Sequence, residues 1–179
     1  MVGPGTFTVR SVIDDNLRPM NEREFFCKRH RIEFPTFKRV LEAMPIDRFD
    51  FRPHERSMSA LELVWTLAQE MAGCLTMIDR GELHWAPPPA PSPREAVQAL
   101  SANYVALDQR VQWLTEEEWL KPSRLYVGGD LLMEQTLGAF LWYLFFDAIH
   151  HRGQLSTYLR PMGGKVPSIY GPSGDDPGR

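Results

Sequence analysis

Three residues whose side chains can bind a metal ion or transfer a proton lie close together in the sequence: Asp147, His150 and His151. Asp147 and His151 are four residues apart, so on a helix their side chains lie on one face, one above the other. A carboxylate and an imidazole at that spacing can bind a divalent metal ion, or the carboxylate can hold the imidazole in one tautomer. The alternative is that neither residue has a functional role: Asp147 is then a solvated aspartate, and His151 is a hydrogen-bonded histidine of the interior. His150 is turned about 100° from His151 and is predicted to lie at the surface or in an interface.

These residues need a helix, and the hydrophobic pattern predicts four long ones because apolar residues recur at three- and four-residue spacing. Their approximate ranges are 22–43, 59–80, 93–114 and 130–159. Pro35 lies inside the first range, so a kink or break is expected near Phe34. One more helical turn is expected at 115–119, and residues 121–129 are predicted to be a loop. Since no segment predicts a sheet convincingly, the expected fold class is all-α.

The starts and ends of two helices carry specific signals. Ser59 followed by Glu62 has the spacing of a capping box, and Ser92 before Pro93 is a typical helix start. Gly81 is suited to the left-handed conformation that ends a helix. The proline-rich segment between the second and third helices favours extended geometry. About eleven extended residues span a helix of about 22 residues, so this segment can act as a crossover that starts the third helix parallel to the second.

The length of 179 residues suits one domain, which we divide into an arm at 1–20, a bundle at 21–171 and a tail at 172–179. A weak strand signal lies in the arm, at Thr6, Thr8 and Val12. The formal net charge of −3 argues against nucleic acid as a partner. The two cysteines form no Cys-x-x-Cys pair, and neither a signal peptide nor an apolar run of about 18 residues is seen. A cytoplasmic protein without a membrane partner is therefore expected.

The sequence that follows Asp147 resembles the C-terminal signature of the DinB-like family. The matching strings are residues 150–155 (HHRGQL) and 158–171 (YLRPMGGKVPSIYG). Residues 37–45 (FKRVLEAMP), 51–59 (FRPHERSMS) and 61–68 (LELVWTLA) are similar to the family's first helix end, first loop and second helix. The resemblance covers most of residues 25–171. It implies a four-helix bundle in up-down-down-up order, which agrees with a crossover between helices 2 and 3.

The resemblance also implies a metal site. Similar proteins place three histidines around a divalent metal, one on the second helix and two on the fourth. Those positions fall on Thr66, Asp147 and His151 here, so only the last is histidine. A neutral hydroxyl is a poor ligand, and Glu70, which shares a helix face with Thr66, could replace it. Such a Glu/Asp/His site would favour manganese or iron over zinc, with nickel also among the candidate ions. The other hypothesis is that the metal site is lost.

Two functions follow from the resemblance. The first is a metal-dependent transferase, or isomerase, that uses low-molecular-weight thiols, with a small-molecule thiol or electrophile as partner; the metal would lower the pKa of the bound thiol. The second is a non-catalytic, stress-associated binding or structural bundle. A homodimer is expected.

Overall fold

The computed structural model describes residues 19–178. In this part of the chain the fold is helical, with five helices and a small three-stranded sheet. The elements in chain order are α1 (Glu22–Glu42), α2 (Ala60–Arg80), β1 (Glu82–Trp85), α3 (Pro93–Val111), α4 (Glu116–Trp119), β2 (Pro122–Val127), β3 (Asp130–Thr136) and α5 (Leu137–Tyr158). Residues 1–18 of the predicted arm, with the strand signal at Thr6, Thr8 and Val12, lie outside the described residues.

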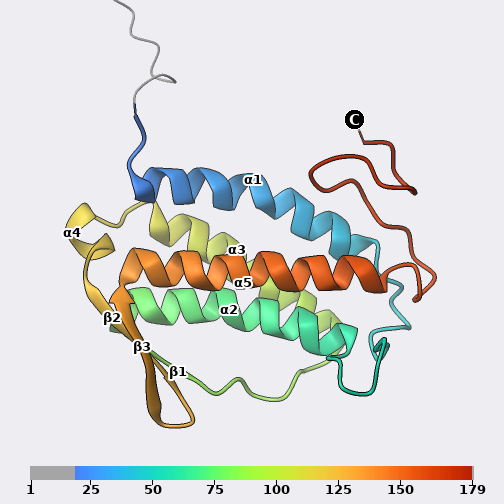
Figure 1. Ribbon diagram of the computed structural model, residues 1–179, viewed down its shortest axis with the longest axis horizontal. Coiled ribbons are helices and arrows are strands. Elements are labelled where there is room, and N and C mark those ends of the chain that lie inside the picture. Colours follow the sequence, from blue (N-terminus) through green and yellow to red (C-terminus); the bar gives the residue numbers. More distant parts are fainter. Residues whose placement is uncertain (1–18, 179) are drawn as a thin grey trace, which may run out of the picture.

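The four long helices lie side by side and enclose the core (Figure 1). Helix α2 packs against α3 and α5, and α1 packs against the same two helices. Their inward faces bury large apolar side chains such as Phe26, Leu67, Met71, Leu100 and Phe140. Each such side chain contributes about 1.5–3 kcal/mol when it leaves water, so this shared core holds α2 and α5 against each other. None of the helices between residues 19 and 178 has the length and apolar character needed to cross a membrane.

The predicted helix boundaries are confirmed where a cap marks them. Ser59 and Glu62 form the expected capping box at the start of α2, and Ser92 with Glu95 forms another at the start of α3. Gly81 ends α2 in the left-handed conformation, with φ of 72°. The short helix α4 occupies the turn predicted at 115–119. Each cap supplies partners to backbone groups that a helix end leaves unpaired.

Helix α1 continues through Pro35, so of the kink or break expected near Phe34, the break does not occur. Proline removes one backbone hydrogen bond, but contacts on both sides of it hold the helix. The Phe34 ring stacks on Tyr104 of α3 with centroids 4.6 Å apart, and the Phe37 ring lies 5.4 Å from the same tyrosine. Such aromatic pairs contribute about 0.5–1.5 kcal/mol beyond area burial, which offsets part of the cost of the proline.

The fold is helical, as predicted, but it is not purely all-α, because residues 82–85, 122–127 and 130–136 add a small sheet in the order β1-β2-β3. Strand β2 pairs in parallel with β1 and antiparallel with β3. The predicted loop at 121–129 is mostly β2, and the last helix begins at Leu137 instead of residue 130. Gly128 and Gly129 form the two-residue turn of the β2–β3 hairpin, with φ of 62° and 95°. Only glycine adopts such angles freely, and Gly-Gly between strands is a typical hairpin turn.

After β1 the chain runs along the outside of the helices to the start of α3 (Figure 1). Trp65 of α2 fixes this crossover because its indole Nε1 donates a hydrogen bond to the Pro88 carbonyl at 2.7 Å. The up-down-down-up order implied by the family resemblance stays a prediction, which the course of this crossover supports.

His30 of α1 is buried in the core without a hydrogen bond to its ring nitrogens from residues 19–178. Its ring stacks on Tyr104 with centroids 3.9 Å apart, and the nearest carboxylate oxygen, Asp108 Oδ1, is 3.8 Å from Nδ1. That separation is too long for a hydrogen bond. Burial therefore dominates and lowers the pKa of His30 to about 4, despite the opposing effect of Asp108.

The contribution of His30 to the free energy of unfolding is expected to fall as the pH drops from about 6.5 to about 4. In this window the unfolded histidine binds a proton that the folded protein excludes, so acid favours unfolding at this residue by up to about 3 kcal/mol. Urea titrations at a series of pH values measure this slope. His30→Phe should flatten it, whereas His54→Gln, at an exposed loop position, should leave it unchanged. Equal slopes for His30→Phe and wild type would contradict the assignment.

Candidate metal centre

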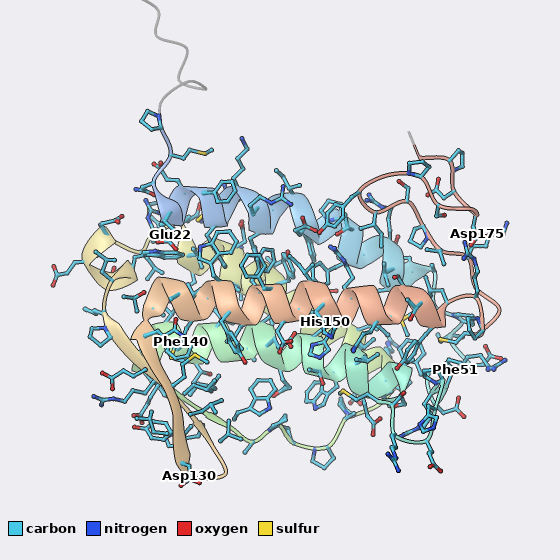
Figure 2. All side chains as sticks on the ribbon, in the orientation of Figure 1. Glu22, Phe51, Asp130, Phe140, His150 and Asp175 are labelled. Carbon is cyan, nitrogen blue, oxygen red and sulfur yellow. The ribbon has the colours of Figure 1, made fainter. Side chains whose placement is uncertain are left out.

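Three side chains that can bind a metal meet where α2 packs on α5: Glu70 from α2, and Asp147 and His151 from α5. Glu70 Oε1 lies 2.7 Å from His151 Nδ1, and Asp147 Oδ1 lies 4.0 Å from the same nitrogen. One ligand atom from each residue lies within 4.8 Å of the other two. Figure 2 shows this stretch of α5, which His150 marks, above α2. Two carboxylates and one imidazole are a competent donor set for a divalent transition metal.

Burial changes steadily across the three side chains. The Glu70 side chain is 1% exposed, His151 is 14% exposed and Asp147 is 44% exposed. The centre therefore reaches from the core at Glu70 to solvent at Asp147. Glu70 Oε2 is buried and has no hydrogen-bond partner among residues 19–178. A buried carboxylate oxygen without a hydrogen-bond partner lowers the stability of the fold, and a bound cation would supply the missing partner.

The electrostatics of the centre follow from this burial. Desolvation is the main reason that the pKa of Glu70 is raised to about 7; the hydrogen bond and charge of His151 oppose this shift, and Asp147 adds to it. Burial also disfavours the charged form of His151, but the hydrogen bond and the charge of Glu70 outweigh it, so the pKa of His151 is raised. At 2.7 Å, Glu70 Oε1 and His151 Nδ1 are joined by a hydrogen bond, which places one proton between them. A metal ion bound here would replace that proton.

Thr66 and His150 occupy different places around this centre. Thr66 lies one turn before Glu70 on α2 and lines a cavity together with Asp147 and His151. His150 is exposed, as predicted, and its ring centroid lies 5.4 Å from that of His151. The structure thus brings Glu70, Asp147 and His151 within ligand distance of one another and places Thr66 in the cavity wall.

The cavity has a volume of about 370 Å³, and the sheet forms much of its wall. The apolar side chains of the wall include Trp85, Leu125, Val127, Leu132 and Tyr143. Four of these come from β1, β2 and β3, and we did not predict them as site residues because we expected a loop and the start of a helix there. The Gly128-Gly129 turn between two apolar segments was the signal that could have revealed the hairpin.

Arg152, next to His151, forms a buried ion pair with Glu33. Its Nη1 donates to Glu33 Oε2 of α1 at 2.6 Å and also to the Thr36 hydroxyl. The guanidinium lies over the Phe37 ring, 4.8 Å from the centroid. Burial alone would raise the pKa of Glu33, but hydrogen bonds from Arg152 and Tyr170 and the nearby positive charges lower it. Both partners are therefore charged, and they join α1 to α5 in the interior.

The C-terminal segment is tied to the same ion pair. The Tyr170 hydroxyl accepts a hydrogen bond from Arg152 Nη2 at 2.7 Å and donates one to Glu33 Oε2 at 2.9 Å. Arg160 pairs with Asp175 at 2.9 Å. Tyr170 and Arg160 thus hold the C-terminal segment on the helices. Tyr158 has another role, because its hydroxyl donates to the Met58 carbonyl in the loop before α2.

The fold and the centre define a helical protein with a candidate divalent-metal site between two of its long helices. A family model, that of the DinB family, matches residues 32–177, and the chain belongs to this family. No curated protein matches the sequence.

Two solved structures of DinB-like proteins are similar to this chain. One, from Bacillus cereus ATCC 10987, has a TM-score of 0.66 and 17% identity, and the match covers 81% of this chain and 95% of that one. The other, from Bacillus subtilis, has a TM-score of 0.62 and 22% identity, and covers 79% and 93%. At these identities the likeness shows the shared fold, and the function has to be argued from the site.

Replacing Arg152 by methionine is expected to lower the free energy of unfolding by about 3–5 kcal/mol, because Glu33 would keep a buried charge without its main partner. The double variant Glu33→Met/Arg152→Met should lose less than the sum of the two single variants. Chemical denaturation measures each value. Arg124→Met breaks an exposed ion pair with Glu134 and is the matched control, for which little change is expected. A loss for Arg152→Met no larger than for this control would refute the structural role.

Proposed function

We propose that this protein binds one divalent metal ion through Glu70, Asp147 and His151. The observation that carries the proposal is the buried Glu70 Oε2 without a hydrogen-bond partner among the described residues, on a side chain whose other oxygen contacts His151. The donor set supports manganese or iron ahead of zinc or nickel because two of its three ligands are hard oxygen donors. Glu70 takes the role of the second-helix ligand, and Thr66 faces the bound small molecule.

The proposed reaction is the transfer of a low-molecular-weight thiol to an electrophile. When bound, the metal would lower the pKa of the thiol and supply thiolate at neutral pH. Asp147, as the most exposed ligand, lies where small molecules reach the centre. His151 is held in orientation by Glu70, and the apolar cavity wall excludes water from the reacting groups.

A specific contact favours a second candidate, a non-catalytic binding or structural bundle without metal. Glu70 Oε1 and His151 Nδ1 already satisfy each other at 2.7 Å, so the two side chains have a stable arrangement of their own. Homodimer formation, a stress-associated role and a cytoplasmic location stay predictions under either function.

Metal binding tests the proposal directly. Protein purified without a His-tag and treated with chelator is expected to take up about one equivalent of Mn²⁺ or Fe²⁺, measured by calorimetry and elemental analysis. Asp147→Asn and His151→Gln should each weaken binding at least about tenfold because each removes a ligand. His150→Gln, at the exposed neighbour, should bind as wild type does. Uptake below about 0.1 equivalent of manganese, iron, zinc and nickel alike would reject the metal site.

Conjugation of chlorodinitrobenzene by several low-molecular-weight thiols tests the reaction. The metal-loaded protein should accelerate thioether formation above background, and chelator should abolish the acceleration. His151→Gln should reduce the rate at least about tenfold, because the ion that activates the thiol is no longer held. If the protein binds metal but no thiol reacts above background, the transferase proposal fails and the binding function is favoured.

A further inference from the structure

We propose that the cavity beside the candidate metal centre binds an uncharged, largely apolar group of a small molecule, such as an aryl ring or a short hydrocarbon chain. The β2–β3 hairpin and α5 supply most of the lining of this cavity. The volume of about 370 Å³ lies within the range of small-molecule sites.

The chemistry of the wall selects the ligand class. Trp85 comes from β1, Leu125 and Val127 come from β2, and Tyr143 and Leu144 come from α5. Among residues 19–178, neither lysine nor arginine lines the cavity, and Asp147 is the one acidic residue of its wall. The basic residue of the wall, His151, is already paired with Glu70 through Nδ1 at 2.7 Å. An anionic group would therefore find no unpaired positive partner in the described wall and would lie beside the carboxylate of Asp147. Repulsion between the ligand's negative charge and this carboxylate discriminates strongly against anions.

An irregularity in the hairpin contributes to the cavity. In the β2–β3 register Met133 pairs with Leu125 and Leu131 pairs with Tyr126, so Leu132 is an extra residue without a partner in β2. Such bulges redirect a side chain and often lie next to functional sites. Leu132 is 58% exposed and lines the cavity, whereas its neighbour Leu131 is 52% exposed and does not. An apolar ligand would cover the exposed part of Leu132 and remove this apolar surface from water, which favours binding.

The cavity adjoins a wider one, which gives the rest of a ligand a place to lie. Met58, Thr66 and Pro87 line both cavities, and the second has a volume of about 730 Å³. Charged side chains occur in its wall, among them Asp50, Arg52 and Glu62. The inner cavity thus takes the apolar group, and a more polar remainder extends past Thr66 into the outer one.

Two fluorescent probes with the same ring system test this inference. N-phenyl-1-naphthylamine is uncharged, and anilinonaphthalene sulfonate carries one negative charge. Chelator-treated protein is expected to bind the uncharged probe saturably, and at least about tenfold more tightly than the sulfonate, a difference of about 1.4 kcal/mol. Asp147→Asn should narrow this difference because it removes the negative charge in the wall.

Matched variants locate the binding. Leu132→Glu should weaken binding of the uncharged probe at least about fivefold, and Leu131→Glu should change it by less than about twofold. If Leu132→Glu disturbs the hairpin by circular dichroism, Tyr143→Ser takes its place, with Phe146→Ser as the control on an exposed residue of α5 outside the cavity. Equal effects of a lining variant and its control, or equal affinity for the two probes, would overturn the inference.

The position of the ligand beside a metal rests on the proposed function, but its binding is measured without metal, so the two ideas fail separately. Metal uptake with no saturable probe binding would reject the apolar site alone. Probe binding with no metal uptake would reject the metal site alone.

Discussion

The buried ion pair between Glu33 and Arg152 is the constraint on which the arrangement of the site depends. It joins α1 to α5 in the interior, and Tyr170 closes it from the C-terminal segment. A buried pair of this kind adds little net stability over apolar packing, but breaking it leaves an unpaired charge, so rotation of α5 that separates the partners is costly. Because His151 is the next residue, the same contact keeps its imidazole turned towards α2 and Glu70.

Helix α5 therefore carries two neighbouring basic side chains that each contact a buried glutamate, and the two pairs differ in one respect. Glu33 has partners on both oxygens, from Arg29, Arg152 and Tyr170. Glu70 has a partner on one oxygen, and its Oε2 has none among residues 19–178. A glutamate buried only for stability is expected to be satisfied as fully as Glu33. This difference supports the proposal that Glu70 binds a ligand.

The sequence was sufficient for the parts of the fold that local patterns determine, and insufficient where distant segments meet. Capping residues such as Ser59 and Ser92 predicted helix starts correctly because a cap acts within one turn. The hairpin was missed because Leu131 and Leu132 continue the apolar spacing of α5, while a bulge hides strand alternation. Asp147 and His151 could be paired from their spacing alone. That Glu70 reaches them depends on how α2 packs against α5, which the sequence suggested only through the family resemblance.

The two carboxylates of the centre and the apolar wall of the cavity both affect which ligand charge the site would accept. A divalent ion held by Glu70 and Asp147 has its charge of +2 balanced by two negative ligands, whereas the three-histidine arrangement implied by the resemblance would leave the full positive charge. A centre that is neutral in total exerts little long-range attraction on an anionic substrate. Among the described residues, the cavity wall adds no lysine or arginine to compensate. Under the proposed function, an aspartate in place of the histidine implied by the resemblance and the apolar side chains of the hairpin would favour the same substrates, those whose reacting group is uncharged.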